Sequence, residues 1–308
     1  MIDRRTFLKL SAPVIVSIPL AVRAQTLAER GRFDEKQLPV ARDLLLEMVN
    51  NERSEAGLSQ LTLDGLACRV ANEHARDMAQ AGFLSHWGSD GRKSYQRYGL
   101  AGGTDALREN VASADPVQSL SPGPVLADLR DLHLSMLYET PPNDGHRKAI
   151  LYPLNTHVGF GVALYERRLR LVEIYLARLI SFDLVQPPGK DGATVLFIGH
   201  VLGQDYQLSG VEVCHEPLPV RPELDWLRTK RSIAFPDAYR TLRPRAPAGK
   251  IYVDGTVGDF ELKPNGKFRV AVQLDKREPG IYTLIFFISR GRDERSVAGA
   301  QVCVLHQT

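Results

Sequence analysis

Cysteine, tryptophan and methionine are scarce in this 308-residue chain, which contains three, two and four of them. Three cysteines are too few for a small domain held together by several disulfides, and an odd number leaves at least one thiol free. The apolar fraction of 44% and the charged fraction of 24% are instead those of a globular protein. The chain is long enough for two domains, each with its own core.

A surplus of one charge sign is also missing. Residues 1–24 contain four of the 39 basic residues and one of the 36 acidic residues, so the remainder of the chain has 35 of each. A neutral chain of this kind gives no indication of a basic surface for nucleic acid. We therefore expect no nucleic-acid partner.

No hydrophobic run after residue 22 approaches the length of a transmembrane helix. The phrase Arg4-Arg5-Thr6-Phe7-Leu8-Lys9 resembles a twin-arginine export motif, and an apolar run over 10–22 follows it. An uncleaved anchor is the alternative, but the run is short and interrupted by Pro13 and Pro19. We expect residues 1–24 to be a signal peptide cut after Ala24, and the protein to be periplasmic or secreted without an integral membrane segment.

Two motifs that would define a reaction are missing as well, namely a helical His-Glu-x-x-His pair and a nucleophile elbow. Ser85 beside His86 does not replace the elbow, because adjacent residues rarely form a nucleophile–base pair. The chemically competent side chains gather instead in four short phrases: Ser85-His86, Arg108-Glu109-Asn110, Tyr138-Glu139 and Gly145-His146-Arg147.

Helical periodicity surrounds these phrases. Apolar residues recur at helical spacing over 39–57 and 64–82. Pro39 suits the first turn of the first helix, Asp64 suits the N-cap of the second, and Gly57 and Gly82 suit their C-terminal ends. A short helix is predicted over 93–98, and a further helix opens at Pro122 and stops before Pro141. Residues 157–164 and 169–179 alternate as two strands.

Four of these stretches together resemble the CAP superfamily of cysteine-rich secretory and pathogenesis-related proteins, in its bacterial form. They are the first-helix phrase 49–58, the second-helix phrase 71–78, Glu109-Asn110 and Gly145-His146-Arg147. The resemblance covers residues 39–181 and implies an α-β-α sandwich. Residues 25–38 are expected to be a loosely held lead-in.

The resemblance also implies a cleft that contains His86, Glu109, Asn110, His146 and Arg147. His86, Glu109 and His146 match the family pattern directly, and Glu139 matches a second acidic position if residues 140–144 include an insertion. Two imidazoles and two carboxylates suit a divalent metal, zinc best of all, so these four residues are the predicted metal ligands. His74 and His133 are expected to lie on helix surfaces or to be packed, and to bind no metal.

Residues 182–192 form a linker by their Pro/Gly-rich composition, and the pattern after them is that of a second domain. Short β-rich runs separated by turns predict an all-β sandwich of Ig-like type over 193–308, with a β-barrel as the alternative. The predicted strands are 195–198, 207–213, 251–253, 267–274 and 281–288. The overall fold class is thus α+β. Cys214 and Cys303 both lie in strand-like phrases and are candidates for a disulfide, which geometry must decide, whereas Cys68 is expected to be buried.

Three functions remain open at this point. The first is a module whose cleft binds a small ligand such as a lipid, a peptide or another cell-envelope component, with or without a metal. The second is a metal-dependent hydrolase in which one glutamate is the base and a metal-bound water the nucleophile. The third is a structural role, with the His/Glu set as a polar core. The second domain favours binding, and we expect it to recruit or position a protein partner.

Overall fold

The computed structural model describes residues 33–186, 194–229, 233–275, 278–291 and 295–306. The predicted signal peptide and most of the predicted lead-in lie outside these ranges. The described end of the lead-in is packed rather than loose, because Phe33 is buried and the 3₁₀ helix η1 (Glu35–Gln37) leads directly into α2 (Leu38–Glu55). No helix within the described ranges is long and apolar enough to cross a membrane.

A four-stranded sheet forms the centre of the first domain. Its order is β1 (Thr62–Leu63), β3 (His157–Tyr165), β4 (Arg168–Ala177), β2 (Ala106–Ala114). Strand β1 runs parallel to β3, and the other two pairs are antiparallel. Strand β2 is therefore an edge strand.

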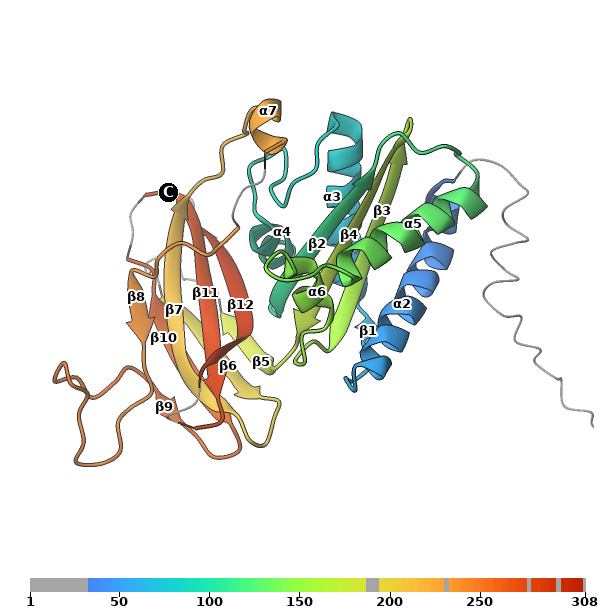
Figure 1. Ribbon diagram of the computed structural model, residues 1–308. Helices are drawn as coiled ribbons and strands as arrows, with labels where there is room; N and C mark the ends of the chain where they lie inside the picture. The colour runs from blue at the N-terminus through green and yellow to red at the C-terminus, as the bar shows by residue number, and fades with distance from the viewer. Residues whose placement is uncertain (1–32, 187–193, 230–232, 276–277, 292–294, 307–308) are drawn as a thin grey trace, which may run out of the picture.

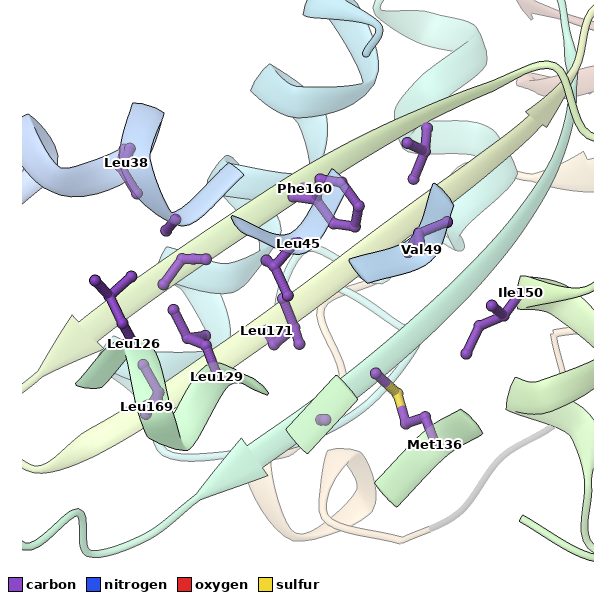
Figure 2. Close-up of a cluster of buried hydrophobic side chains, with 14 of the residues drawn as sticks. Leu38, Leu45, Val49, Leu126, Leu129, Met136, Ile150, Phe160, Leu169 and Leu171 are labelled. Carbon is purple, nitrogen blue, oxygen red and sulfur yellow. The ribbon is translucent and has the colours of Figure 1, made fainter. Parts of the chain in front are cut away.

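Helices cover both faces of this sheet (Figure 1). Helices α2, α5 (Pro122–Leu137) and α6 (Gly145–Ile150) share one hydrophobic core with the sheet, part of which is drawn in Figure 2. Helix α3 (Gly65–Ala81) and α4 (Ser94–Leu100) contribute to a second core on the opposite face. The predicted α-β-α sandwich is confirmed.

Helix α3 begins and ends where the sequence predicts. The Asp64 carboxylate accepts a hydrogen bond from the Ala67 backbone N–H at 2.8 Å, and Gly82 adopts a left-handed conformation with φ 73° at the C-terminal end. The helix lies directly on β3, because a Cβ added to Gly161 would be 2.1 Å from the Ala71 carbonyl carbon. Only glycine fits at that crossing.

The second domain consists of two four-stranded antiparallel sheets around one core. One has the order β5 (Ile180–Gln186), β6 (Thr194–Val201), β10 (Lys267–Gln273), β9 (Glu261–Leu262). The other has the order β12 (Val297–His306), β11 (Gly280–Ser289), β7 (Gln207–Pro217), β8 (Arg240–Leu242), and a short helix α7 (Leu224–Leu227) follows β7. The α+β class is confirmed, and the Ig-like assignment stays a prediction.

Two sequence predictions for this half are corrected. The domain begins at Ile180 rather than at residue 193, because Phe182 of β5 packs against Phe197 and Phe286 in the core; the predicted linker 182–192 thus includes most of a strand. Residues 251–253 form no strand. Ile251 and Val253 are exposed in a loop, so their apolar character does not reflect burial in a sheet.

The predicted disulfide is also corrected. Cys214 of β7 and Cys303 of β12 both pair in register with Thr283 of β11, which lies between them. Two strand spacings put the cysteine Cα atoms about 9–10 Å apart, beyond the reach of a disulfide. Both are buried free thiols, as is Cys68.

The two domains meet through α4 and the beginning of β2. The Glu216 carboxylate of β7 accepts hydrogen bonds from Lys93, Tyr95 and Gln96 at 2.6–3.0 Å. Next to this contact, the Gln301 backbone N–H donates to the Thr104 carbonyl at 2.9 Å, which joins the edges of the two sheets. The segment between β7 and β8 then crosses the first domain, where Trp226 packs edge-on against Trp87.

Candidate functional site

Strand β2 presents alternate side chains to the two faces of the sheet. Val111 belongs to the α3 core, and Ala112 to the α2/α5 core. Because side chains alternate along a strand, Glu109 lies on the α3 side, whereas Arg108 and Asn110 lie on the α5/α6 side. The edge strand β2 thus presents a carboxylate on the α3 face of the sheet, and a guanidinium and an amide on the α5/α6 face.

On the α3 side, Glu109 holds His86. The His86 Nδ1 lies 3.0 Å from Glu109 Oε1, and Arg97 of α4 donates to Glu109 Oε2 at 2.7 Å. Burial alone would raise the pKa of Glu109, but the Arg97 charge and the His86 hydrogen bond outweigh it and hold that pKa at about 2. An ionised carboxylate only accepts hydrogen bonds, so His86 donates through Nδ1–H, and in a neutral ring Nε2 is then the nitrogen with the lone pair.

On the other side, Glu139 holds His146 in the same way. Its Oε1 lies 2.5 Å from His146 Nδ1, and its Oε2 accepts the His146 backbone N–H at 2.9 Å, within the first turn of α6. One carboxylate thereby fixes both the ring and the backbone of the same residue. The His146 Nε2, like that of His86, is left facing away from its carboxylate.

Both pairs line one cavity of about 590 Å³, which we call the β2 cleft. Its walls include residues 107–110 of β2, His86, Glu139, His146, Tyr152 and, from the second domain, Ile233. All four predicted metal ligands are therefore brought to one place. Each glutamate is nevertheless occupied by its histidine, and within the described ranges no three His, Cys, Asp or Glu side chains converge as a metal-binding group.

Of the two other predicted cleft residues, Asn110 lines the β2 cleft and Arg147 does not. Asn110 is 1% exposed and donates from Nδ2 to the His146 carbonyl (3.2 Å) and to Glu173 (3.3 Å), so it ties β2 to α6 at the wall of the cleft. Arg147 does not line the cleft, which corrects its prediction as a cleft residue. Its guanidinium donates to the Leu137 carbonyl at 2.7 Å and satisfies the C-terminal end of α5.

A second histidine–carboxylate cluster lies beneath the cleft. His133 is fully buried, with Nδ1 2.6 Å from Glu173 and Nε2 2.8 Å from Glu52. Burial would lower the pKa of His133, but the two carboxylates raise it to about 10, so the ring is an imidazolium. Because Asn110 also bonds to Glu173, this charged cluster supports the α6 side of the cleft.

His74 is packed as predicted. It is 1% exposed on α3, and its Nε2 lies 2.8 Å from the Ser85 carbonyl. Burial lowers its pKa to about 3, so the ring stays neutral. Its hydrogen bond holds the turn that places the neighbouring His86.

Sequence reasoning missed Arg97, Arg108, Tyr152 and Ile233. A signal existed for Arg108, because period-two alternation puts it on the same face of β2 as Asn110. The ion pair between Arg97 and Glu109 and the arrival of Ile233 from the second domain depend on tertiary packing, and no local pattern indicates them.

Comparisons with known proteins match the first domain. The family model described as "CAP: Cysteine-rich secretory protein family" matches residues 46–175. A comparison with curated proteins finds no match.

Solved structures similar to this chain come from several bacteria. An extracellular protein from Bacillus anthracis that contains an SCP domain is 22% identical, with a TM-score of 0.35 over 48% of this chain and 45% of that chain. The chain thus spans less than half of the length of that protein. An outer surface protein from Borrelia burgdorferi is 18% identical, with a TM-score of 0.38 over 47% of this chain and 96% of that chain. The CAP domain of Enterococcal PrgA is 14% identical, with a TM-score of 0.37 over 51% of this chain and 70% of that chain.

Proposed function

Since this chain carries a CAP domain, matched over residues 46–175, we propose that it is an exported binding protein whose ligand occupies the β2 cleft. One observation carries the proposal: two histidines from opposite faces of the sheet line one cavity, each with its Nδ1 bonded to a carboxylate and its Nε2 without a hydrogen-bond partner among the described residues. The ligand is a small molecule or cell-envelope component, such as a lipid or a peptide.

The two histidines fit a divalent metal, but the two glutamates are not placed as the metal ligands that the sequence predicts. A carboxylate behind a neutral imidazole fixes the ring and raises its basicity, as it does for many metal-bound histidines. His86 and His146 would therefore hold the ion through Nε2, and Glu109 and Glu139 would orient them rather than bind it. A bound ion would supply a positive charge that attracts an anionic or carbonyl-bearing ligand.

Binding is favoured over hydrolysis because of what the glutamates already do. Both oxygens of Glu109 are taken, by His86 and Arg97, and both oxygens of Glu139 are taken by His146. Neither is placed as a free general base. A purely structural polar core is disfavoured by the cavity, since His86 and His146 keep 24% and 32% of their side chains exposed.

Export belongs to the same proposal. The twin-arginine phrase at the N-terminus supports it, and Arg4-Arg5→Lys-Lys should block translocation because the pair is the recognised part of the signal. Unchanged accumulation of the double variant outside the cytoplasm would contradict this route.

Calorimetric zinc titration of the exported protein tests the metal-assisted part of the cleft. His86→Ala and His146→Ala should each weaken binding at least tenfold, because each removes a ligand. His200→Ala, in the second domain, is the matched control and should leave the affinity unchanged. If wild type binds no zinc, manganese, magnesium or calcium at millimolar concentration, the metal is excluded.

Mass spectrometry of extracts from the purified protein tests the ligand itself. A compound should co-purify with wild type and be depleted in the His86→Ala/His146→Ala double variant, while circular dichroism verifies that the variant is folded. A compound retained equally by both proteins would place its binding elsewhere.

A further inference from the structure

The charges that line the β2 cleft are paired, with one exception. His86 pairs with Glu109, His146 with Glu139, and Lys148 with Asp144 at 2.7 Å. Arg108 lines the same cavity, yet among the described residues it has no carboxylate within ion-pairing distance. Its guanidinium lies over the Tyr152 ring instead, 3.4 Å from the ring centroid.

This position is unusual for an arginine. A partly buried guanidinium without a counter-charge loses hydration, and its contacts with the Tyr152 side chain offset only part of that loss. The burial lowers the pKa of Arg108, although an arginine in such a setting stays charged. Stacking also fixes the plane of the guanidinium, which pre-organises its N–H groups for a planar, bidentate partner.

The residues around Arg108 indicate what else a ligand bound to its guanidinium would contact. Arg108 is on the face of β2 that also holds Asn110, whose side chain contacts the His146 carbonyl, so an anion bound by Arg108 would lie on the His146 side of the cleft. Ala149, Tyr152 and Ile233 supply apolar walls to the same cavity. Ile233 comes from the second domain, so the apolar wall is complete only with both domains in place.

We propose that Arg108 is the head-group residue of the β2 cleft and that the ligand is an amphiphile with a terminal carboxylate or phosphate and an apolar chain. The inference rests on the proposed ligand cleft and deepens it. The oxyanion binds to the Arg108 guanidinium, and the apolar chain lies against Tyr152 and Ile233. No covalent step is involved.

Calorimetry on the full chain, stripped of metal with a chelator, tests this with three matched probes: octanoate, octyl phosphate and octanol. Hydrogen bonds to charged groups contribute about 1.5–3 kcal/mol, so one or both anions should bind roughly 10–100-fold more tightly than octanol. Whichever of octanoate and octyl phosphate binds more tightly identifies the head group. Arg108→Gln should abolish the preference for the anions over octanol, and Arg108→Lys should retain part of it.

Lys148→Gln is the control, because Lys148 is the other cation of the lining but is paired and 72% exposed. Equal affinity for the three probes, or equal losses in Arg108→Gln and Lys148→Gln, would overturn the inference. So would the absence of binding by all three. The zinc titration of the His86 and His146 variants is a separate measurement, since the anion titrations use metal-free protein. A failure of the Arg108 inference is therefore distinguishable from a failure of the proposed metal-assisted cleft.

Discussion

Replacing Glu173 by glutamine should destabilise the protein through His133. The His133 side chain is completely buried, and its protonated ring is held by Glu173 and Glu52. The rise of its pKa from 6.5 to about 10 corresponds, at about 1.36 kcal/mol per pKa unit, to about 5 kcal/mol of stabilisation below pH 6.5, of which roughly 4 kcal/mol remains at pH 7. Removing one partner of a buried pair costs about 3–5 kcal/mol. We expect Glu173→Gln to lose about 3–5 kcal/mol of unfolding free energy at pH 7.

The pH dependence has a definite sign. A histidine whose pKa is raised on folding contributes its full stabilisation below its unfolded pKa of about 6.5 and loses it as the pH rises through about 10. The gap in stability between wild type and Glu173→Gln should therefore narrow between pH 7 and pH 10. Urea denaturation at both pH values measures the gap, and NMR titration of the His133 ring measures its pKa.

Glu52→Gln is the matched control. The Glu52 side chain is 13% exposed, whereas that of Glu173 is fully buried, so solvent screens the loss of charge at Glu52 more effectively. Its cost should be smaller. A His133 pKa at or below 6.5 in wild type would show that the two carboxylates do not stabilise its charged ring. Equal stability of Glu173→Gln and wild type at pH 7 would show the same.

Two further predictions concern the cleft and the sheet. The pKa of Glu109 is depressed to about 2, so its contribution to the free energy of unfolding is present above its unfolded pKa of about 4.3 and is lost as the pH falls through about 2. In denaturation experiments, the difference in stability between wild type and Glu109→Gln should therefore narrow over that pH range. A constant difference would contradict the depressed pKa. Gly161→Ala should lower the free energy of unfolding by about 3 kcal/mol or more, because the added Cβ would overlap the α3 backbone. Gly145→Ala is the control: no atom lies within 4 Å of its added Cβ, so it should be neutral or stabilising by up to about 1 kcal/mol. Thermal melts measure both, and equal melting temperatures for the two variants would refute the close packing of α3 on β3.

Much of the first domain could be predicted because its signals are local. Asp64 and Gly82 mark the ends of α3 through backbone chemistry that requires no knowledge of tertiary structure. The β3–β4 hairpin likewise follows from alternation on both sides of a polar turn. The family resemblance then supplied His86, Glu109, Glu139 and His146, which the structure brings to one cavity.

The errors arose where long-range packing decides. Residues 251–253 have the apolar character of a strand but no neighbouring strand that would bury them. Cys214 and Cys303 lie in similar phrases, yet an intervening strand separates them. The role of Glu109 could not be read from its own phrase either, because its charge state depends on Arg97 from a different element.

¹⁵N NMR of the histidine rings during zinc addition determines whether His86 and His146 form one site through their Nε2 atoms, as we propose. We expect the Nε2 resonances of His86 and His146 to shift together, with a single midpoint, while both Nδ1 atoms remain protonated by virtue of their bonds to Glu109 and Glu139. His133 and His74, buried in their own contacts, should not shift. Independent midpoints for the two rings, or a response at Nδ1 instead of Nε2, would contradict the account.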